Sequence, residues 1–201
     1  MESPLDTPAS PAVVSPDPSV SSPPSHRSSL FREIVETALL TAAIFLLVNA
    51  ATGRFKIDGN SMEPNLHSDE YVIVDKVTYL FGAPQRGDIV VFYREGDPKD
   101  YIKRVIGLPG ETVEIVGGAV LVGGQPLDEP YKAPWSGGYA ARTLAQGEYF
   151  VMGDNRGNSQ DSRNFGPILF KNIVGRAWII YWPPSDWALV PHHTYASAGS
   201  S

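Results

Sequence analysis

Residues 101–111 read YIKRVIGLPGE, a pattern typical of a strand that runs into a turn. Successive side chains of a strand point to opposite faces, so Lys103 lies on one face and Arg104 on the other. Whichever face packs inward therefore buries a cation. Similar short runs of β-branched and aromatic residues, separated by turn residues, fill residues 54–187. The pattern predicts a mainly β, mostly antiparallel domain.

One hairpin can be located directly in the sequence. The runs TVEIV and AVLV are separated only by Gly117 and Gly118. Two glycines in this position favour a tight two-residue turn between antiparallel strands.

Composition excludes several classes of function. The chain has 201 residues, a net charge of −6 and no cysteine. The negative charge argues against a general nucleic-acid binder. Without cysteine there are no disulfides, no thiolate metal sites and no cysteine nucleophile. The HExxH spacing of zinc peptidases is also absent.

The chain is predicted to have four parts. Residues 1–29 are rich in Ser and Pro and carry too few large apolar side chains to offset the entropy of ordering, so we expect disorder. Residues 30–53 are expected to form a transmembrane anchor helix, because their long apolar run approaches the ~20 residues that cross a bilayer. Residues 54–190 form the β-rich domain, and residues 191–201 a flexible tail.

Two other interpretations of the apolar run stay open. It could be an amphipathic helix of a soluble domain, although apolar residues cover every face from residue 38 to 48. It could also be a cleavable signal, since residues 48–50 read VNA, a small-residue cleavage pattern. Basic residues flank both ends, so the charge distribution does not set an orientation.

Two polar stretches are candidates for chemistry. Residues 57–66 read IDGNSMEPNL and place Ser61 in a turn, where a serine is more often a helix cap or turn former than a nucleophile. Residues 153–168 read GDNRGNSQDSRNFGPI, a long polar loop between two apolar strands. Such a loop is often functional, and the alternative is a surface loop held by its own hydrogen bonds.

A base for Ser61 is the next requirement, because a serine hydroxyl needs one to become a nucleophile. No histidine has the sequence pattern of a catalytic triad. A lysine can replace it only as the neutral amine, and an ordinary lysine has a pKa of ~10.4. Burial among apolar groups lowers that pKa by up to several units. Lys103 on an inward strand face meets the condition; alternatively, its ammonium reaches solvent or pairs with a carboxylate.

The motifs NSMEPNL, RGDIVVF, YIKRVIGLPGETV and GDNRGNSQDSRNFGP, in this order behind an apolar segment, resemble those of type I signal peptidases. The resemblance covers about residues 30–187. It implies an antiparallel β-sheet or partly open barrel preceded by a single N-terminal transmembrane helix. It also implies a membrane-anchored serine endopeptidase that removes signal peptides from exported preproteins, without a metal or organic cofactor.

The resemblance also implies roles for individual residues. Ser61 corresponds to the nucleophile, Lys103 to the general base, and Ser159 to a hydroxyl that orients the lysine amine. Asp161 and Arg163 correspond to a structural ion pair behind the site. Shallow pockets for small substrate side chains are expected from Phe55, Ile57, Met62, Leu66, Tyr101 and Ile102.

Two positions depart from the family pattern. The backbone N–H of Ser61 is expected to stabilise the oxyanion, and some members add a serine hydroxyl two residues before the nucleophile. This chain has Gly59 there, which puts the second donor in doubt. Asn65 stands where the family commonly has threonine, and we expect a small effect.

The implied partners are preprotein signal peptides and the lipid bilayer, with no nucleic acid and no obligate protein partner. The implied location is the cell membrane, with a single span and the catalytic domain outside the cytoplasm. An alternative is a membrane-tethered β-sheet binding module in which Ser61 and Lys103 are only structural. A self-cleaving Ser–Lys repressor is a further alternative, but it needs a DNA-binding helical head, which residues 1–29 do not resemble.

Overall fold

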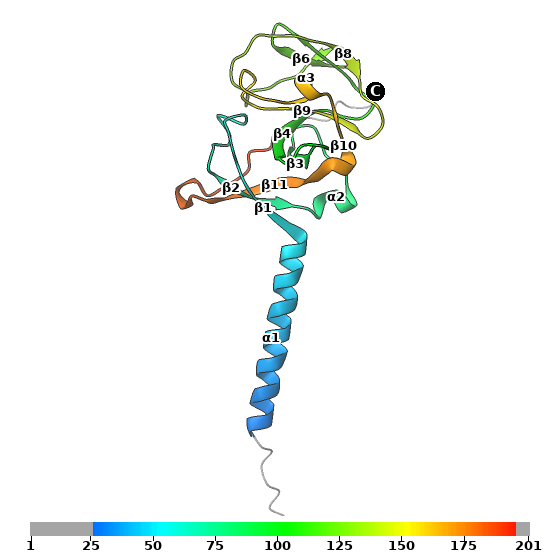
Figure 1. The fold of residues 1–201 in the computed structure, drawn as a ribbon. Coiled ribbons are helices and arrows are strands. Elements are labelled where there is room, and N and C mark those ends of the chain that lie inside the picture. The colour runs from blue at the N-terminus through cyan, green and yellow to red at the C-terminus, as the bar shows by residue number, and fades with distance from the viewer. Residues whose placement is uncertain (1–25, 196–201) are drawn as a thin grey trace, which may run out of the picture. The chain divides into compact units, whose positions relative to one another are not determined.

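The computed structural model describes residues 26–195 (Figure 1). Most of the segment predicted to be disordered, and residues 196–201 of the predicted tail, lie outside the described residues. Two compact units, Met1–Ile44 and Phe45–Ser201, divide the chain within the first helix.

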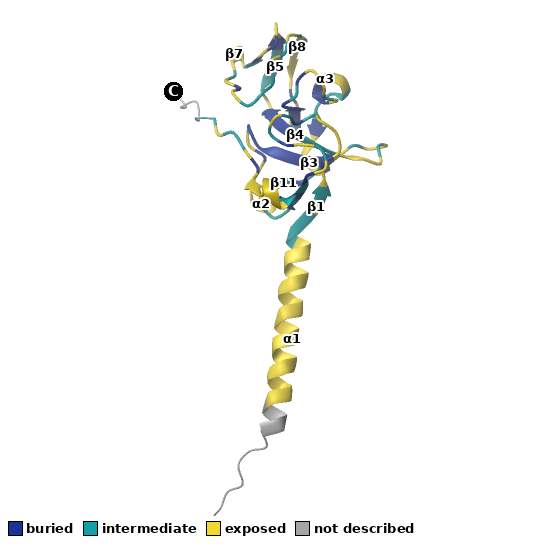
Figure 2. Ribbon diagram, turned by 90° about the vertical axis from the view of Figure 1, so that its left-hand side faces the viewer, coloured by how far each residue is buried: buried dark blue, intermediate teal, exposed yellow. Residues whose placement is uncertain are grey.

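Helix α1, His26–Ala51, contains the predicted anchor. Its segment Leu30–Ala51 has 22 residues and a mean hydropathy of 2.0, and none of its most apolar window is buried. Figure 2 shows the exposed surface along this helix. It is long and apolar enough to cross a bilayer.

The domain after α1 consists of two antiparallel sheets. The strands of the main sheet follow the order β1-β2-β11-β3-β4-β9-β10, and β12 pairs with β11. Their bounds are Thr52–Lys56 (β1), Tyr71–Asp75 (β2), Ile89–Tyr93 (β3), Asp100–Gly107 (β4), Glu148–Met152 (β9), Ile168–Leu169 (β10), Ile173–Trp182 (β11) and Ala188–Leu189 (β12).

A smaller sheet has the strand order β7-β6-β5-β8. Its strands are Thr112–Val116 (β5), Ala119–Val122 (β6), Gln125–Pro126 (β7) and Tyr139–Thr143 (β8). The short helices of the domain are α2 (Thr78–Phe81), α3 (Ser162–Phe165), η1 (Phe170–Asn172) and η2 (Pro184–Asp186). Within residues 26–195 neither sheet closes into a barrel. The predicted class, mainly antiparallel β behind one apolar helix, is confirmed.

The predicted glycine hairpin joins β5 to β6. Gly117 and Gly118 have φ angles of 58° and 86°, and the flanking Val116 and Ala119 are paired. Both angles lie in the left-handed region, which a two-residue turn of this kind requires. Apolar residues of β5 and β6 then pack with those of β4 and β9 in one core cluster, so the small sheet is attached to the main one.

The core of the main sheet fixes the segment that follows β1. Met62 and Leu66 are completely buried in a cluster with residues of β2, β3 and β11. Burying a large aliphatic side chain contributes about 1.5–3 kcal/mol. These two side chains therefore anchor the turn that carries Ser61.

The chain beyond β12 does not form a free tail before Tyr195. We call residues 190–195 the C-terminal strap. The N–H of Val190 donates to the carbonyl of Trp178 (2.9 Å), and the hydroxyl of Tyr195 lies 2.6 Å from that of Tyr131. Contacts from distant parts of the chain therefore hold residues 191–195, which the sequence assigned to a flexible tail.

His192 is the central contact of the C-terminal strap. Its Nδ1 accepts the N–H of Ile89 at 3.0 Å, and its Nε2 lies 2.8 Å from the carbonyl of Ala177. Burial lowers the pKa of His192 to about 4, so it is neutral and can accept the Ile89 bond at neutral pH. Next to it, the backbone of His193 approaches Gly87 so closely that a Cβ there would collide with it.

A chain that ends at Leu189 should be less stable than one that ends at Tyr195, which keeps every contact described above. Losing the C-terminal strap leaves the buried N–H of Ile89 without its acceptor, and each such unsatisfied group costs about 1–3 kcal/mol. We expect the melting temperature, measured by circular dichroism, to fall by at least about 5 °C. Equal melting temperatures would contradict the structural role of the strap.

Candidate active site

Ser61 and Lys103 meet although 42 residues separate them in the chain. Ser61 lies in the turn after β1, and Lys103 lies in the middle of β4. Nζ of Lys103 is 2.6 Å from Oγ of Ser61 and 2.8 Å from the carbonyl oxygen of Ile102. The lysine is only 3% exposed, so its amine does not reach solvent. This is the geometry that a nucleophile and its base require.

Burial changes the acidity of this lysine. It lowers the pKa of Lys103 to about 8, although the negative charges of Asp161 and Asp154 act in the opposite direction. At pH 7 about one amine in ten is then neutral, against about one in several thousand at the ordinary pKa. An amine with this pKa can accept a proton at neutral pH, as a base requires.

Arg104 lies on the opposite face of β4 and is completely buried. Its Nε and Nη2 donate to the two carboxylate oxygens of Asp154 at 2.8 and 2.7 Å. Its Nη1 donates to the carbonyls of Gly87 (3.0 Å) and Pro191 (3.1 Å), the latter in the C-terminal strap. Sequence reasoning placed a cation on each face but did not find this pair, because no local signal links Arg104 to Asp154.

Asn65 connects the turn of Ser61 to the same carboxylate. Its Nδ2 donates to Asp154 Oδ2 and to the carbonyl of Tyr131, both at 2.8 Å. A threonine hydroxyl has a single donor and does not replace both bonds. The departure from the family pattern at this position therefore has a structural use in this chain.

The loop that begins at Gly153 holds the turn of Ser61 directly. The N–H of Asn155 donates to the carbonyl of Ser61 at 3.1 Å, and its side-chain amide donates to the carbonyl of Asn60 at 3.0 Å. A Cβ at Gly153 would collide with the carbonyl oxygen of Ser61 and the side chain of Ser159. Only glycine permits this close approach. Sequence reasoning singled out the loop but not these two residues.

Ser159 is close to the site, but its predicted hydrogen bond is not formed in this structure. Its Oγ is buried and has no hydrogen-bond partner among residues 26–195. A role in orienting the amine of Lys103 stays a prediction. A buried hydroxyl without a partner is unusual in a folded protein.

Asp161 and Arg163 form the ion pair that the resemblance implied. Nε and Nη2 of Arg163 each donate to the Asp161 carboxylate at 2.8 Å. The carboxylate also accepts the N–H of Gly153 at 3.0 Å and caps helix α3. It thereby fixes the two ends of the polar loop relative to each other.

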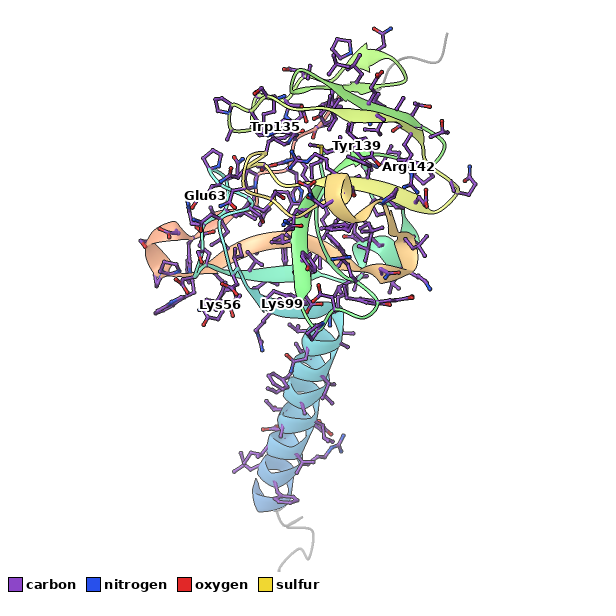
Figure 3. The ribbon with its side chains drawn as sticks, turned by 45° about the horizontal axis from the view of Figure 1, so that its top comes forward. Lys56, Glu63, Lys99, Trp135, Tyr139 and Arg142 are labelled. Carbon is purple, nitrogen blue, oxygen red and sulfur yellow. The ribbon has the colours of Figure 1, made fainter. Side chains whose placement is uncertain are left out.

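A cleft of about 880 Å³ opens beside Ser61 and Lys103. Four of the six predicted substrate contacts line it: Phe55, Ile57, Tyr101 and Ile102. Met62 and Leu66 do not, because both are completely buried in the core beneath the Ser61 turn. The cleft wall also carries Lys56 and Lys99 (Figure 3).

Gly59 provides no second oxyanion donor from a side chain. There is space for a side chain at this position, because a Cβ on Gly59 would meet no heavy atom within 4 Å. The φ angle of Gly59, 92°, nevertheless disfavours any residue other than glycine. Its N–H donates to Ser68 Oγ at 3.2 Å. Among the described residues no group of three or more His, Asp or Glu side chains could hold a metal ion.

The chain was compared with known proteins. The model of the family described as signal peptidase, peptidase S26, matches residues 30–182. A signal peptidase I of Leptolyngbya laminosa is 38% identical over 90% of this chain and 92% of its own. Signal peptidase I S of Bacillus subtilis is 36% identical over 79% of this chain and 92% of its own.

Among solved structures, the crystal structure of a signal peptidase I from Enterococcus faecalis V583 is 34% identical and has a TM-score of 0.41. It covers 47% of this chain and 97% of its own. The family match and the relatives confirm what the four motifs implied: this chain belongs to the signal peptidase family, peptidase S26, and is an enzyme of that family.

Proposed function

We propose that this chain is a membrane-anchored serine endopeptidase that cleaves signal peptides from exported preproteins, with Ser61 as nucleophile and Lys103 as general base. The observation that carries the proposal is the 2.6 Å separation of Ser61 Oγ from the buried amine of Lys103. The lowered pKa of Lys103 supports it, because only the neutral amine can accept the serine proton.

The mechanism is acyl transfer to water in two steps. The neutral amine of Lys103 takes the proton of Ser61 as Oγ attacks the scissile carbonyl carbon. The backbone N–H of Ser61 donates to the oxyanion, and the protonated lysine then gives its proton to the departing amine. An acyl-enzyme ester remains. Lys103 next deprotonates a water molecule that attacks the ester, and Ser61 leaves with its proton restored.

The cleft supports a substrate with small side chains near the cut. Phe55, Ile57, Tyr101 and Ile102 line it with apolar surface close to Ser61. We propose that shallow pockets there accept small residues at the first and third positions before the cleaved bond. Asp161 and Arg163 hold the polar loop behind the site, and Ser159 orients the lysine amine.

The proposed anchor is the segment Leu30–Ala51, which has 22 residues and a mean hydropathy of 2.0. The sheet begins at Thr52, directly after it, so the domain follows the span without a linker. We propose a single span in the cell membrane with the catalytic domain outside the cytoplasm. Preproteins emerging from the bilayer are then presented on the side where the domain lies.

Substituting either member of the pair should abolish cleavage of a purified preprotein. Ser61→Ala removes the nucleophile and Lys103→Ala the base, and we expect each to lower kcat by at least about 10³-fold. Lys103→Arg should be equally inactive, because a guanidinium stays protonated. Ser185→Ala and Lys171→Arg, both at exposed positions, serve as controls. Full cleavage activity of Ser61→Ala or Lys103→Ala would eliminate the proposed mechanism, whereas an unsubstituted chain that does not cleave would favour the binding-module alternative.

The pH dependence of kcat/KM should follow the ionisation of Lys103. Its pKa of about 8 means that the rate rises as pH increases through about 8 and levels off above it, because the amine must be neutral. Hydrolysis of a short peptide substrate, measured from pH 6 to 10, checks this. A rate that kept rising to a midpoint near ~10.4 would show an unperturbed lysine and contradict the buried-base mechanism.

Topology can be tested by adding protease to intact cells. We expect degradation of the domain after residue 51, whereas a tag fused before residue 1 should be protected until the membrane is opened. Protection of the domain instead would reverse the proposed orientation. Release of the chain by carbonate extraction would rule out a membrane span.

A further inference from the structure

The loop between β7 and β8 buries a carboxylate that has no part in the mechanism above. Residues 128–136 read DEPYKAPWS, and Glu129 is only 7% exposed whereas its neighbour Asp128 is exposed. A buried carboxylate is costly unless its oxygens are paired, so its partners indicate what it does.

Glu129 is bound by three side chains. Its main partner is Arg156, itself 2% exposed: Nη1 of Arg156 donates to Oε2 at 3.1 Å, and Nη2 contacts Oε1. Lys132 Nζ donates to Oε2 at 2.9 Å, and the hydroxyl of Tyr131 donates to Oε1 at 3.1 Å. Burial alone would raise the pKa of Glu129, but Arg156 and Lys132 outweigh it and lower the pKa. The carboxylate is therefore ionised at neutral pH.

Arg156 transmits this contact to the polar loop of the active site. Its Nε donates to the carbonyl of Gly153 at 3.0 Å, and the preceding residue, Asn155, holds the carbonyls of Ser61 and Asn60. The guanidinium thus fixes the backbone of residues 153–156. That backbone in turn holds the nucleophile's turn.

Two further hydrogen bonds join the loop of Glu129 to the same region. The N–H of Ala133 donates to the carbonyl of Asp154 at 3.1 Å, and Asn65 Nδ2 donates to the carbonyl of Tyr131 at 2.8 Å. The loop therefore touches both segments that form the site. Figure 3 shows Trp135 of this loop on the same side of the domain as Glu63 of the Ser61 turn.

We propose that Glu129 is a positioning residue for catalysis: through Arg156 it fixes residues 153–156 and so holds Ser61 in place against Lys103. This inference rests on the proposed roles of Ser61 and Lys103. Glu129 does not touch the reacting atoms. A buried ion pair contributes little net stability compared with apolar side chains of similar volume, but its geometry is strongly directional. We therefore expect the pair of Glu129 and Arg156 to orient residues 153–156 rather than to stabilise the fold.

The first test is Glu129→Gln, which keeps the shape of the side chain and removes its charge. We expect kcat, per folded molecule, to fall by at least about 10-fold with KM within about twofold of wild type, because small displacements of a nucleophile slow the chemical step. The matched control is Asp128→Asn in the same loop, for which both constants should stay within about twofold.

A double variant separates positioning from stability, because Glu129→Gln leaves the guanidinium of Arg156 buried without its counter-ion. In Glu129→Gln/Arg156→Met that charge is also removed, so the melting temperature should recover. The double variant lacks Arg156 and therefore its hydrogen bond to the carbonyl of Gly153, so kcat should stay at least about 10-fold low. Recovery of kcat together with the melting temperature would overturn the positioning role.

Ser61→Ala, measured in parallel, distinguishes this inference from the proposed function. If Ser61→Ala keeps its activity, the proposed function itself fails. If Ser61→Ala is inactive but folded Glu129→Gln cleaves within twofold of the wild-type kcat, only the role of Glu129 is wrong. A rise in KM with unchanged kcat would likewise assign Glu129 to substrate binding and overturn the inference.

Discussion

Strand β4 is hydrogen-bonded to β3 on one side and β9 on the other, and both of its faces are covered. This constraint forces the adjacent cations Lys103 and Arg104 into the protein, each on its own face. The donors of Arg104 are used by Asp154 and two carbonyls. Lys103 has a hydroxyl and one carbonyl instead, so burial lowers its pKa. One strand therefore supplies a structural ion pair and the amine that we propose as the base.

Burying the base is costly for the fold. Lowering the pKa of Lys103 from 10.5 to about 8 corresponds to about 3 kcal/mol against the protonated form. The unfolded chain binds more protons between these values, so this penalty is full below pH 8 and disappears as pH rises towards 10.5. Apolar packing beneath the site, including Met62 and Leu66, offsets it. Burial of Lys103 thus does not stabilise the fold at neutral pH.

The sequence was informative where the signal was local. The strand at residues 101–106, the hairpin at Gly117 and Gly118 and the apolar helix could be predicted from neighbouring residues alone. The meeting of Ser61 and Lys103 could be expected for two reasons. A serine nucleophile needs a base, which a buried lysine can supply, and the order of the motifs resembles that of type I signal peptidases. The pair of Arg104 with Asp154 could not be predicted, since it joins residues 50 positions apart through strand register. The C-terminal strap was missed for the same reason.

The bond between Ser61 and Lys103 cannot hold the site together by itself. A single hydrogen bond contributes only about 1 kcal/mol net, whereas fixing a lysine side chain costs about 1.5–2 kcal/mol of rotamer entropy. The geometry must come from what surrounds the pair. Residues 153–156 are held from three sides: by the carbonyl of Ser61, by the guanidinium of Arg104 in β4 and by the carboxylate of Glu129. Activity should therefore depend on residues that never contact a substrate.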